Sequence, residues 1–244
     1  MTARTTAGAV VVAALCTAVL TACSSGDGPV LWPGDLSGDK TTQSFAAEGF
    51  TEVSLGGDAN LTLTQGDNFS VDVTTDSALF DSITVVVVGA ELQINQEYTI
   101  IGSQPAMDVA ITLPDLTQLH LSGAADARVT GIRADNLKVQ LTGSSDAEIE
   151  ADAAVLTLSV SGAGSVVMRG TVAVASISVS GAADIDGKDV TIGDATIDVS
   201  GAGSVSARVR GSLDARVSGA GNVTYYGDPE ISEEVSGAGS LRRG

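Results

Sequence analysis

Hydrophobic and polar residues alternate along most of the chain, in short runs separated by glycine. Seven runs that precede a recurring glycine-rich segment read LHL, VQL, LSV, ISV, IDV, ARV and EEV, and the runs that follow it include ARV, AEIE, VVM, VSARV and VTYY. Alternation with a period of two, carried largely by β-branched residues, is typical of strands with one buried face. The pattern therefore predicts an all-β chain.

The glycine-rich segments recur at a regular interval. VSGAGSV occurs twice, and SGAADA, TGSSDA, SGAADI, SGAGNV and SGAGSL are its close relatives. Their marker glycines lie 18 to 20 residues apart, at Gly123, Gly143, Gly162, Gly181, Gly201, Gly219 and Gly237. So regular a period is typical of a solenoid, in which each unit buries its apolar face only by stacking on its neighbours.

The length of one unit predicts the kind of solenoid. About 19 residues, at about 3.3 Å per strand residue, make one closed coil, and parallel coils stack about 4.8 Å apart. We therefore expect a parallel β-helix over residues 116–244, with each glycine-rich segment forming the same sharp corner. A Ser or Thr precedes every marker glycine, and we expect these hydroxyls to form hydrogen bonds up and down the column.

Residues 41–115 alternate in the same way but lack the SGAG segment. The strand-like stretches are 50–73, 83–88 and 91–96. We interpret this region as irregular first coils or a β-sandwich-like cap, because a solenoid needs an atypical end unit that covers the unpaired edge of its first coil. At the opposite end, Arg242 and Arg243 are expected to protect the last edge.

The N-terminal residues predict a lipoprotein signal. Arg4 precedes an apolar run at 7–20, which is followed by Leu-Thr-Ala-Cys ending at Cys23. This ending resembles a bacterial lipobox, which implies that residues 1–22 are a signal peptide and that Cys23 is lipidated. The alternative is an ordinary secretory signal with an incidental cysteine. Residues 23–40 are rich in Gly, Ser, Asp and Pro and are expected to form a flexible tether.

Charge restricts the partners. The formal net charge is −18, with 30 acidic against 12 basic residues. Such a charge argues against nucleic acid and against contact with an anionic membrane surface. We expect a body that its lipid anchor holds at the cell membrane, facing the extracytoplasmic side. With Cys16 in the signal peptide and Cys23 lipidated, no disulfide is expected, and no cofactor or metal site is predicted.

Acidic residues at one corner position are the first candidate site. Asp126, Asp146 and Asp184 each lie three residues after a marker glycine, so Asp126 and Asp146 should lie on adjacent coils about 5 Å apart. Carboxylates that close can share a proton, bind a hard cation or act as an acid/base pair. The alternative is that they are solvated turn residues.

A basic and aromatic group near the C-terminus is the second candidate. Arg208, Arg210 and Tyr225 are candidate contacts for an anionic glycan. Alternatively, these arginines and Arg216 form an ion-pair patch with Asp198 and Asp214. Adjacent strand residues point to opposite faces, so either Tyr225 or its neighbour is expected to lie in the core. The single histidine, His120, is expected on the outer face of its strand.

Several stretches together resemble a known family. They are the F-x-x-V-x-L pattern beginning at Phe50, the segment VAITLPDLTQLHLSGAADA at 109–127, the tandem SGAG corners and the closing YYGDPEISEEVSGAGSL. The sequence resembles the family of auto-transporter adhesins with a head GIN domain, a domain of unknown function, over residues 45–241. The resemblance implies a β-helix-like fold on a secreted or surface protein and supplies no catalytic residues. A lipoprotein signal departs from auto-transporter secretion.

Three classes of function follow. The leading hypothesis is a non-catalytic surface lipoprotein for adhesion, envelope interaction or scaffolding, whose partner is a glycan or an envelope protein. The second is a carbohydrate-active enzyme that uses Asp126 and Asp146 on a polysaccharide. The third is a ligand-binding sensor subunit.

Overall fold

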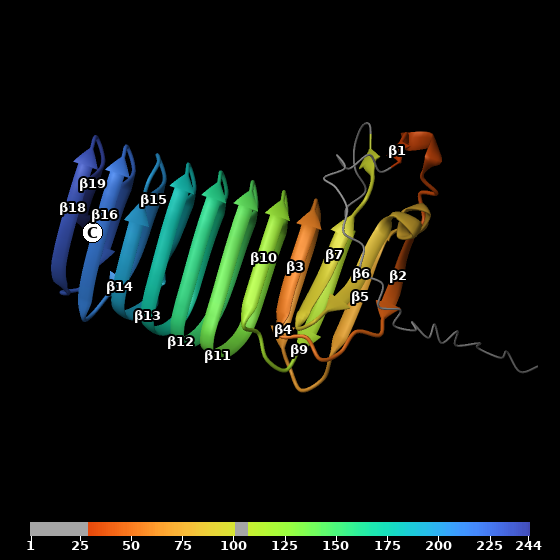
Figure 1. Cartoon of the computed structure of the whole chain (residues 1–244), viewed down its shortest axis with the longest axis horizontal. Coiled ribbons are helices and arrows are strands. Elements are labelled where there is room, and N and C mark those ends of the chain that lie inside the picture. The colour runs from red at the N-terminus through yellow and green to blue at the C-terminus, as the bar shows by residue number, and fades with distance from the viewer. Residues whose placement is uncertain (1–28, 101–106) are drawn as a thin grey trace, which may run out of the picture.

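The computed structural model describes residues 29–100 and 107–244, and in these ranges the chain coils into a parallel β-solenoid (Figure 1). Residues 1–28, which contain the predicted signal peptide and Cys23, lie outside the described residues. The strands of the regular coils are β10 (Gln118–Gly123), β11 (Asp126–Gly143), β12 (Asp146–Gly162), β13 (Ser165–Gly181), β14 (Asp184–Val199), β15 (Ser204–Val209), β16 (Ser212–Gly219), β17 (Asn222–Tyr226), β18 (Glu230–Gly237) and β19 (Ser240–Arg243).

Each coil has two straight legs joined at the glycine corner. β11 to β14 run continuously around a bend, so each supplies the trailing leg after one corner and the leading leg before the next. Leading legs pair in parallel with leading legs, and trailing legs with trailing legs. We call the two resulting faces the leading sheet and the trailing sheet. The predicted all-β solenoid is confirmed.

The corners stack through the backbone. Ser144 N donates to Gly123 O at 2.8 Å and Ala163 N donates to Gly143 O at 2.9 Å, and the same bond recurs in later coils. In the hydroxyl column, the hydroxyl of Thr142 donates to the carbonyl oxygen of Leu121 on the neighbouring coil at 3.3 Å, so at this position the expected bond along the column is made to the backbone. Backbone groups satisfy one another between coils, so the serines are free to face solvent.

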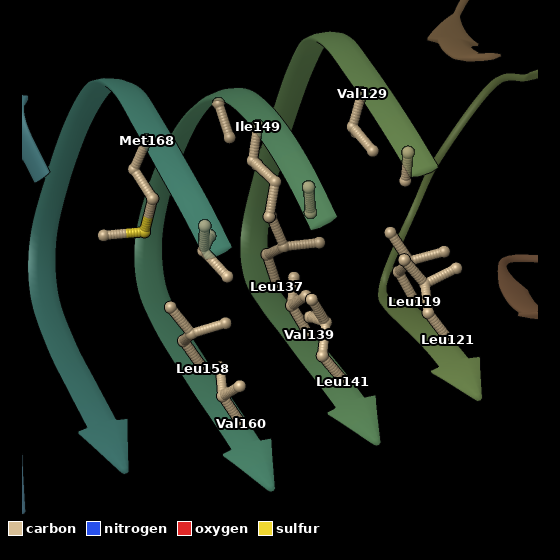
Figure 2. Close-up of a cluster of buried hydrophobic side chains, with 14 of the residues drawn as sticks. Leu119, Leu121, Val129, Leu137, Val139, Leu141, Ile149, Leu158, Val160 and Met168 are labelled. Atoms are coloured by element: carbon tan, nitrogen blue, oxygen red, sulfur yellow. The ribbon is translucent and has the colours of Figure 1, made fainter. Parts of the chain in front are cut away.

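The core is a set of columns of small and medium aliphatic side chains. Leu119, Val139 and Leu158 occupy the same inward position on three successive coils and are at most 1% exposed. Figure 2 shows these side chains and their neighbours pointing into the interior from both legs. Alternation points every second residue of a strand into the interior, and each inner coil is covered by the coils on its two sides.

The first portion contains more of the solenoid than its sequence suggested. Its strands are β1 (Val30–Leu31), β2 (Lys40–Phe45), β3 (Glu52–Gly57), β4 (Ala59–Gln65), β5 (Ser70–Asp76), β6 (Ile83–Val88), β7 (Glu91–Gln96), β8 (Thr99–Ile100) and β9 (Met107–Leu113), with short 3-10 helices η1 (Pro33–Asp35) and η2 (Ser77–Ser82). β3 and β4 form a regular coil on which β10 and β11 stack.

The corner of this coil was missed in the sequence. Gly57 is in register with Gly123 and has a φ of 105°, so the segment SLGGDAN at 54–60 is a further copy of the corner with glycine in place of serine. The coil formed by β7 and β9 stacks on its other side. Spatial order and chain order therefore differ: the β3–β4 coil lies between two coils that follow it in the sequence.

Antiparallel strands cover the N-terminal end. β5 pairs antiparallel with the edge strand β9, β6 pairs antiparallel with β7, and β2 is added outside β5. The aromatic rings of Phe50 and Phe69 meet here at 5.0 Å between centroids. The expected atypical end unit is thus present, and it ends the parallel sheets by reversing the strand direction.

The end of the predicted tether is held against this cap. β1 pairs with β8, and the buried carboxylate of Asp76 accepts bonds from Ser37 Oγ at 2.7 Å, Gly38 N at 2.7 Å and Ala78 N at 3.0 Å. Burial alone would raise the pKa of Asp76, but these hydrogen bonds outweigh it and lower the pKa to about 2. Residues 30–39 therefore dock on the body, in contrast to the free segment that their composition suggested.

The C-terminal end is open. In the described part of the chain, β18 pairs with β16 and β19 with β17, and no strand lies on their outer edges. Every residue of β18 is exposed. Of the two arginines expected to protect this edge, Arg242 donates to Thr224 Oγ1 at 3.2 Å and Arg243 pairs with Asp228 at 2.7 Å.

The corner makes a testable prediction about stability. A Cβ on Gly123 would lie 2.5 Å from Gly57 O, and the φ of Gly123 is 107°. Gly123→Ala should therefore lower the free energy of unfolding by about 3 kcal/mol, through backbone strain and overpacking together. The measurement is urea unfolding followed by circular dichroism.

Gly89→Ala is the matched control. Gly89 also has a positive φ, 66°, but nothing lies within 4 Å of the position that a Cβ would take there. This variant should cost only about 1 kcal/mol. Equal losses in the two variants would contradict the idea that coil-to-coil approach at the corner limits the side chain.

Candidate functional site

The predicted aspartates belong to a polar column along one edge of the trailing sheet. Register stacks the corner residues of successive coils in the order Asp108, Asn60, Asp126, Asp146, Ser165, Asp184, Ser204, Asn222 and Ser240. Asp126 and Asp146 are direct neighbours, as expected. Asp184 is not adjacent to them, because Ser165 lies between.

Neighbours in this column bind one another. Asp146 accepts hydrogen bonds from Ser165 N at 2.7 Å and Ser165 Oγ at 2.8 Å. At the start of the column, Asn60 donates to Asp108 at 2.8 Å, and this bond, with help from Lys40, lowers the pKa of Asp108. Polar contacts within the column therefore use part of the hydrogen-bonding capacity that a ligand would need.

An open groove of about 450 Å³ lies over the paired aspartates. Its lining includes Asn60, Asp126, Arg128, Asp146 and Glu148. Arg128 bridges to Glu148 at 3.0 Å on the next coil. No group of three or more His, Cys, Asp or Glu side chains suited to a metal ion occurs in the ranges that the structure describes. The groove thus offers a carboxylate pair beside one ion pair.

The second candidate group is divided between the two sheets. Arg208 lies on the trailing sheet, where its guanidinium stacks over Tyr226 at 5.7 Å and its Nε donates to Lys188 O at 2.9 Å. Arg216 lies on the leading sheet. The three arginines that are close in sequence therefore do not form one cluster.

Their individual surroundings differ. Tyr225 is partly buried against the core and Tyr226 faces outward, so one tyrosine of the pair points into the interior as predicted. Arg210 is exposed in the bend that follows β15. Arg216 pairs with Asp214 at 2.7 Å and lies 3.9 Å from Asp198. The ion-pair alternative is confirmed for Arg216.

A further surface was not singled out from the sequence: the outward face of the leading sheet over its middle coils. We call it the hydroxyl face and define it by the register of four coils as Gln118, His120, Ser122, Lys138, Gln140, Thr142, Thr157, Ser159, Ser161, Ser176, Ser178 and Ser180. His120 is half-buried here between Ser54 and Gln140. The alternating runs TLSVSG and SISVSG carried the signal for this face.

The hydroxyl face is nearly uncharged and regular. Lys138 is the one residue of these twelve with a full charge, although the chain as a whole is strongly acidic. Rows of side chains repeat about every 4.8 Å between coils and about every 7 Å along a strand. Hydroxyl and amide groups both donate and accept hydrogen bonds. The face is therefore a lattice of hydrogen-bonding groups, most of them hydroxyls and amides.

A family model matches residues 49–229, and its description is "Putative auto-transporter adhesin, head GIN domain". The chain belongs to this family. The resemblance predicted from the sequence is thus confirmed, and the family description indicates a non-catalytic role at the cell surface. Within the described residues, no helix is both long and apolar enough to cross a membrane.

Solved structures share this fold. A putative adhesin from Bacteroides fragilis has a TM-score of 0.81 at 22% identity, covering 87% of this chain and 99% of its own. A putative adhesin from Parabacteroides merdae has a TM-score of 0.71 at 17% identity, covering 88% and 99%. A protein from Parabacteroides distasonis described as a putative lipid binding protein has a TM-score of 0.67 at 21% identity, covering 88% and 99%. No curated protein matches the chain.

The polar column gives a prediction that separates the two aspartates. Asp146→Ala should lower the free energy of unfolding by about 1 kcal/mol, because it removes two hydrogen bonds to Ser165. Asp126→Ala should leave stability unchanged or raise it slightly, because it removes a like charge opposite Asp146. Urea unfolding of both variants provides the measurement. A larger loss in Asp126→Ala would show that its carboxylate has a structural role that this geometry lacks.

Proposed function

We propose that the protein is a lipid-anchored surface protein that contacts a neutral, hydroxyl-rich polymer through the hydroxyl face without transforming it. The polymer is a glycan of the cell envelope or of a host surface. The observation that carries this proposal is the hydroxyl face, in which hydroxyl and amide side chains predominate and no carboxylate occurs, on a sheet of an otherwise acidic chain.

The regular spacing of the lattice favours a repeating partner. Each hydroxyl contributes little on its own, since it exchanges a bond to water for a bond to the ligand. Many equivalent contacts along one polymer act together, because the second and later contacts are intramolecular. A rigid sheet also loses little entropy on binding. The family description as an adhesin supports the same class of role.

Lipid anchoring is the second part of the proposal and rests on the segment that ends at Cys23. Acyl chains on Cys23 would hold the body at the extracytoplasmic side of the cell membrane. In the sequence, only residues 24–29 lie between Cys23 and the docked segment that begins at Val30.

Catalysis on a polysaccharide is the competing function. The specific observation in its favour is that Asp126 and Asp146 lie on adjacent coils in an open groove, and adjacent carboxylates occur in retaining glycosidases. The hydrogen bonds that Asp146 accepts from Ser165 favour a structural role for that carboxylate.

Binding to the hydroxyl face is tested with residues 24–244 and a panel of cell-wall and host-type glycans, with products followed by mass. Ser178→Glu should weaken binding about tenfold, because it places a charge and extra volume in the lattice. Ser204→Glu, which adds the same charge on the trailing sheet, is the matched control and should bind normally. Equal binding by both variants would place the contact elsewhere, and cleavage that disappears in Asp126→Ala would establish the enzyme instead.

Anchoring is tested separately in cells that express the full chain. Cys23→Ala should abolish incorporation of a labelled fatty acid and move the protein from the membrane fraction to the soluble fraction. Cys16→Ala should keep both the label and the membrane location, because Cys16 lies within the predicted signal peptide. Labelling that persists in Cys23→Ala would contradict the proposed anchor.

A further inference from the structure

The open C-terminal coil exposes residues that every other coil buries. Register aligns Ile231, Glu233 and Val235 of β18 with Leu213, Ala215 and Val217 of β16, which are at most 1% exposed. Ile231 is 44% exposed and Val235 is 37% exposed. The inner side of this coil and the unpaired edges of β18 and β19 therefore form a surface with apolar and backbone groups facing solvent.

The two legs of this coil carry opposite charges. β18 contains Glu230, Glu233 and Glu234, whereas β19 contains Arg242 and Arg243. One charge on each leg occupies an inward position, because Glu233 follows the column of Ala215 and Arg243 follows that of Tyr225. A charge in a core column is costly under an apolar cover, but an opposite charge facing it offsets much of that cost.

From these features we propose that the C-terminal coil associates with the same coil of a second copy of the chain, about a twofold axis that runs along the strands. Such an axis places β18 of each copy against β19 of the other, in antiparallel pairing. Inward residues then meet inward residues, and the register brings Val235 opposite Leu241, Glu234 opposite Arg242 and Glu233 opposite Arg243. Both pairs of edges are closed at once, and the assembly stops at two copies.

Repulsion between like charges disfavours the other possible twofold axis. An axis perpendicular to the strands would set β18 against β18 and β19 against β19, and so oppose glutamates with glutamates and arginines with arginines. The N-terminal end of the same molecule shows the preferred geometry, because the antiparallel strands β5 and β6 cover the parallel edges of β9 and β7. Antiparallel closure of a parallel coil is thus already used in this fold.

The ion pairs that these charged residues form within one copy can be exchanged for ion pairs between copies. Arg243 pairs with Asp228, whose side chain is 83% exposed, and Glu234 lies 3.9 Å from Arg216 with its own side chain 78% exposed. Exposed ion pairs of this kind contribute little free energy, so breaking them opposes association only weakly.

The association is measured by sedimentation velocity on residues 24–244, a fragment that contains every buried hydrophobic residue of the described chain. We expect a concentration-dependent doubling of mass that weakens with added salt. Glu234→Arg and Arg242→Glu should each raise the dimer dissociation constant about tenfold or more. The twofold axis makes each substitution occur twice in the interface, and each time it sets like charges opposite one another. The double variant should restore the dimer.

Glu148→Arg is the matched control for charge reversal at a surface ion pair, and it should leave the mass unchanged because Glu148 lies far along the trailing sheet from this end. A chain that stays monomeric at every concentration overturns the proposal. A dimer that Glu234→Arg strengthens indicates the perpendicular axis, and a mass that grows beyond two copies indicates head-to-tail stacking. Either result also overturns it.

Discussion

The close approach of one backbone corner to the next is the constraint on which this structure depends. Each corner carbonyl accepts a hydrogen bond from the coil above it, and the space at the marker glycines is too small for a side chain. The small residues of the corner follow from this one contact. Because each coil from β10 onward must meet this constraint, a close copy of the same segment recurs in the sequence of each of these coils.

The same constraint determines what the surface can present. Once the corners fix the coils in register, each outward position becomes a column, and the chemistry of that column depends only on which residue occupies it in successive coils. On the leading sheet this produces the hydroxyl face, and at the trailing corner it produces a polar column whose members bind one another. Function in such a fold comes from columns of residues on several coils, and a shallow surface replaces the deep cavity of many enzymes.

The two ends of the solenoid solve the problem of unpaired edges in different ways. Antiparallel strands, two phenylalanine rings and the hydrogen-bonded carboxylate of Asp76 close the N-terminal end. The C-terminal coil instead keeps inward charges and exposed aliphatic side chains. A single chain thus has one protected end and one end whose residues suit association, and this polarity gives the molecule a direction relative to its N-terminal segment.

The sequence by itself determined the all-β class, the coil length, the corner and the family, because these features repeat locally and each copy reinforces the others. It also indicated that Asp126 and Asp146 are neighbours. Tertiary structure alone decided that the β3–β4 coil lies between later coils and that Gly57 marks a corner. Those facts depend on pairing between residues far apart in the chain, which leaves no periodic trace in the sequence.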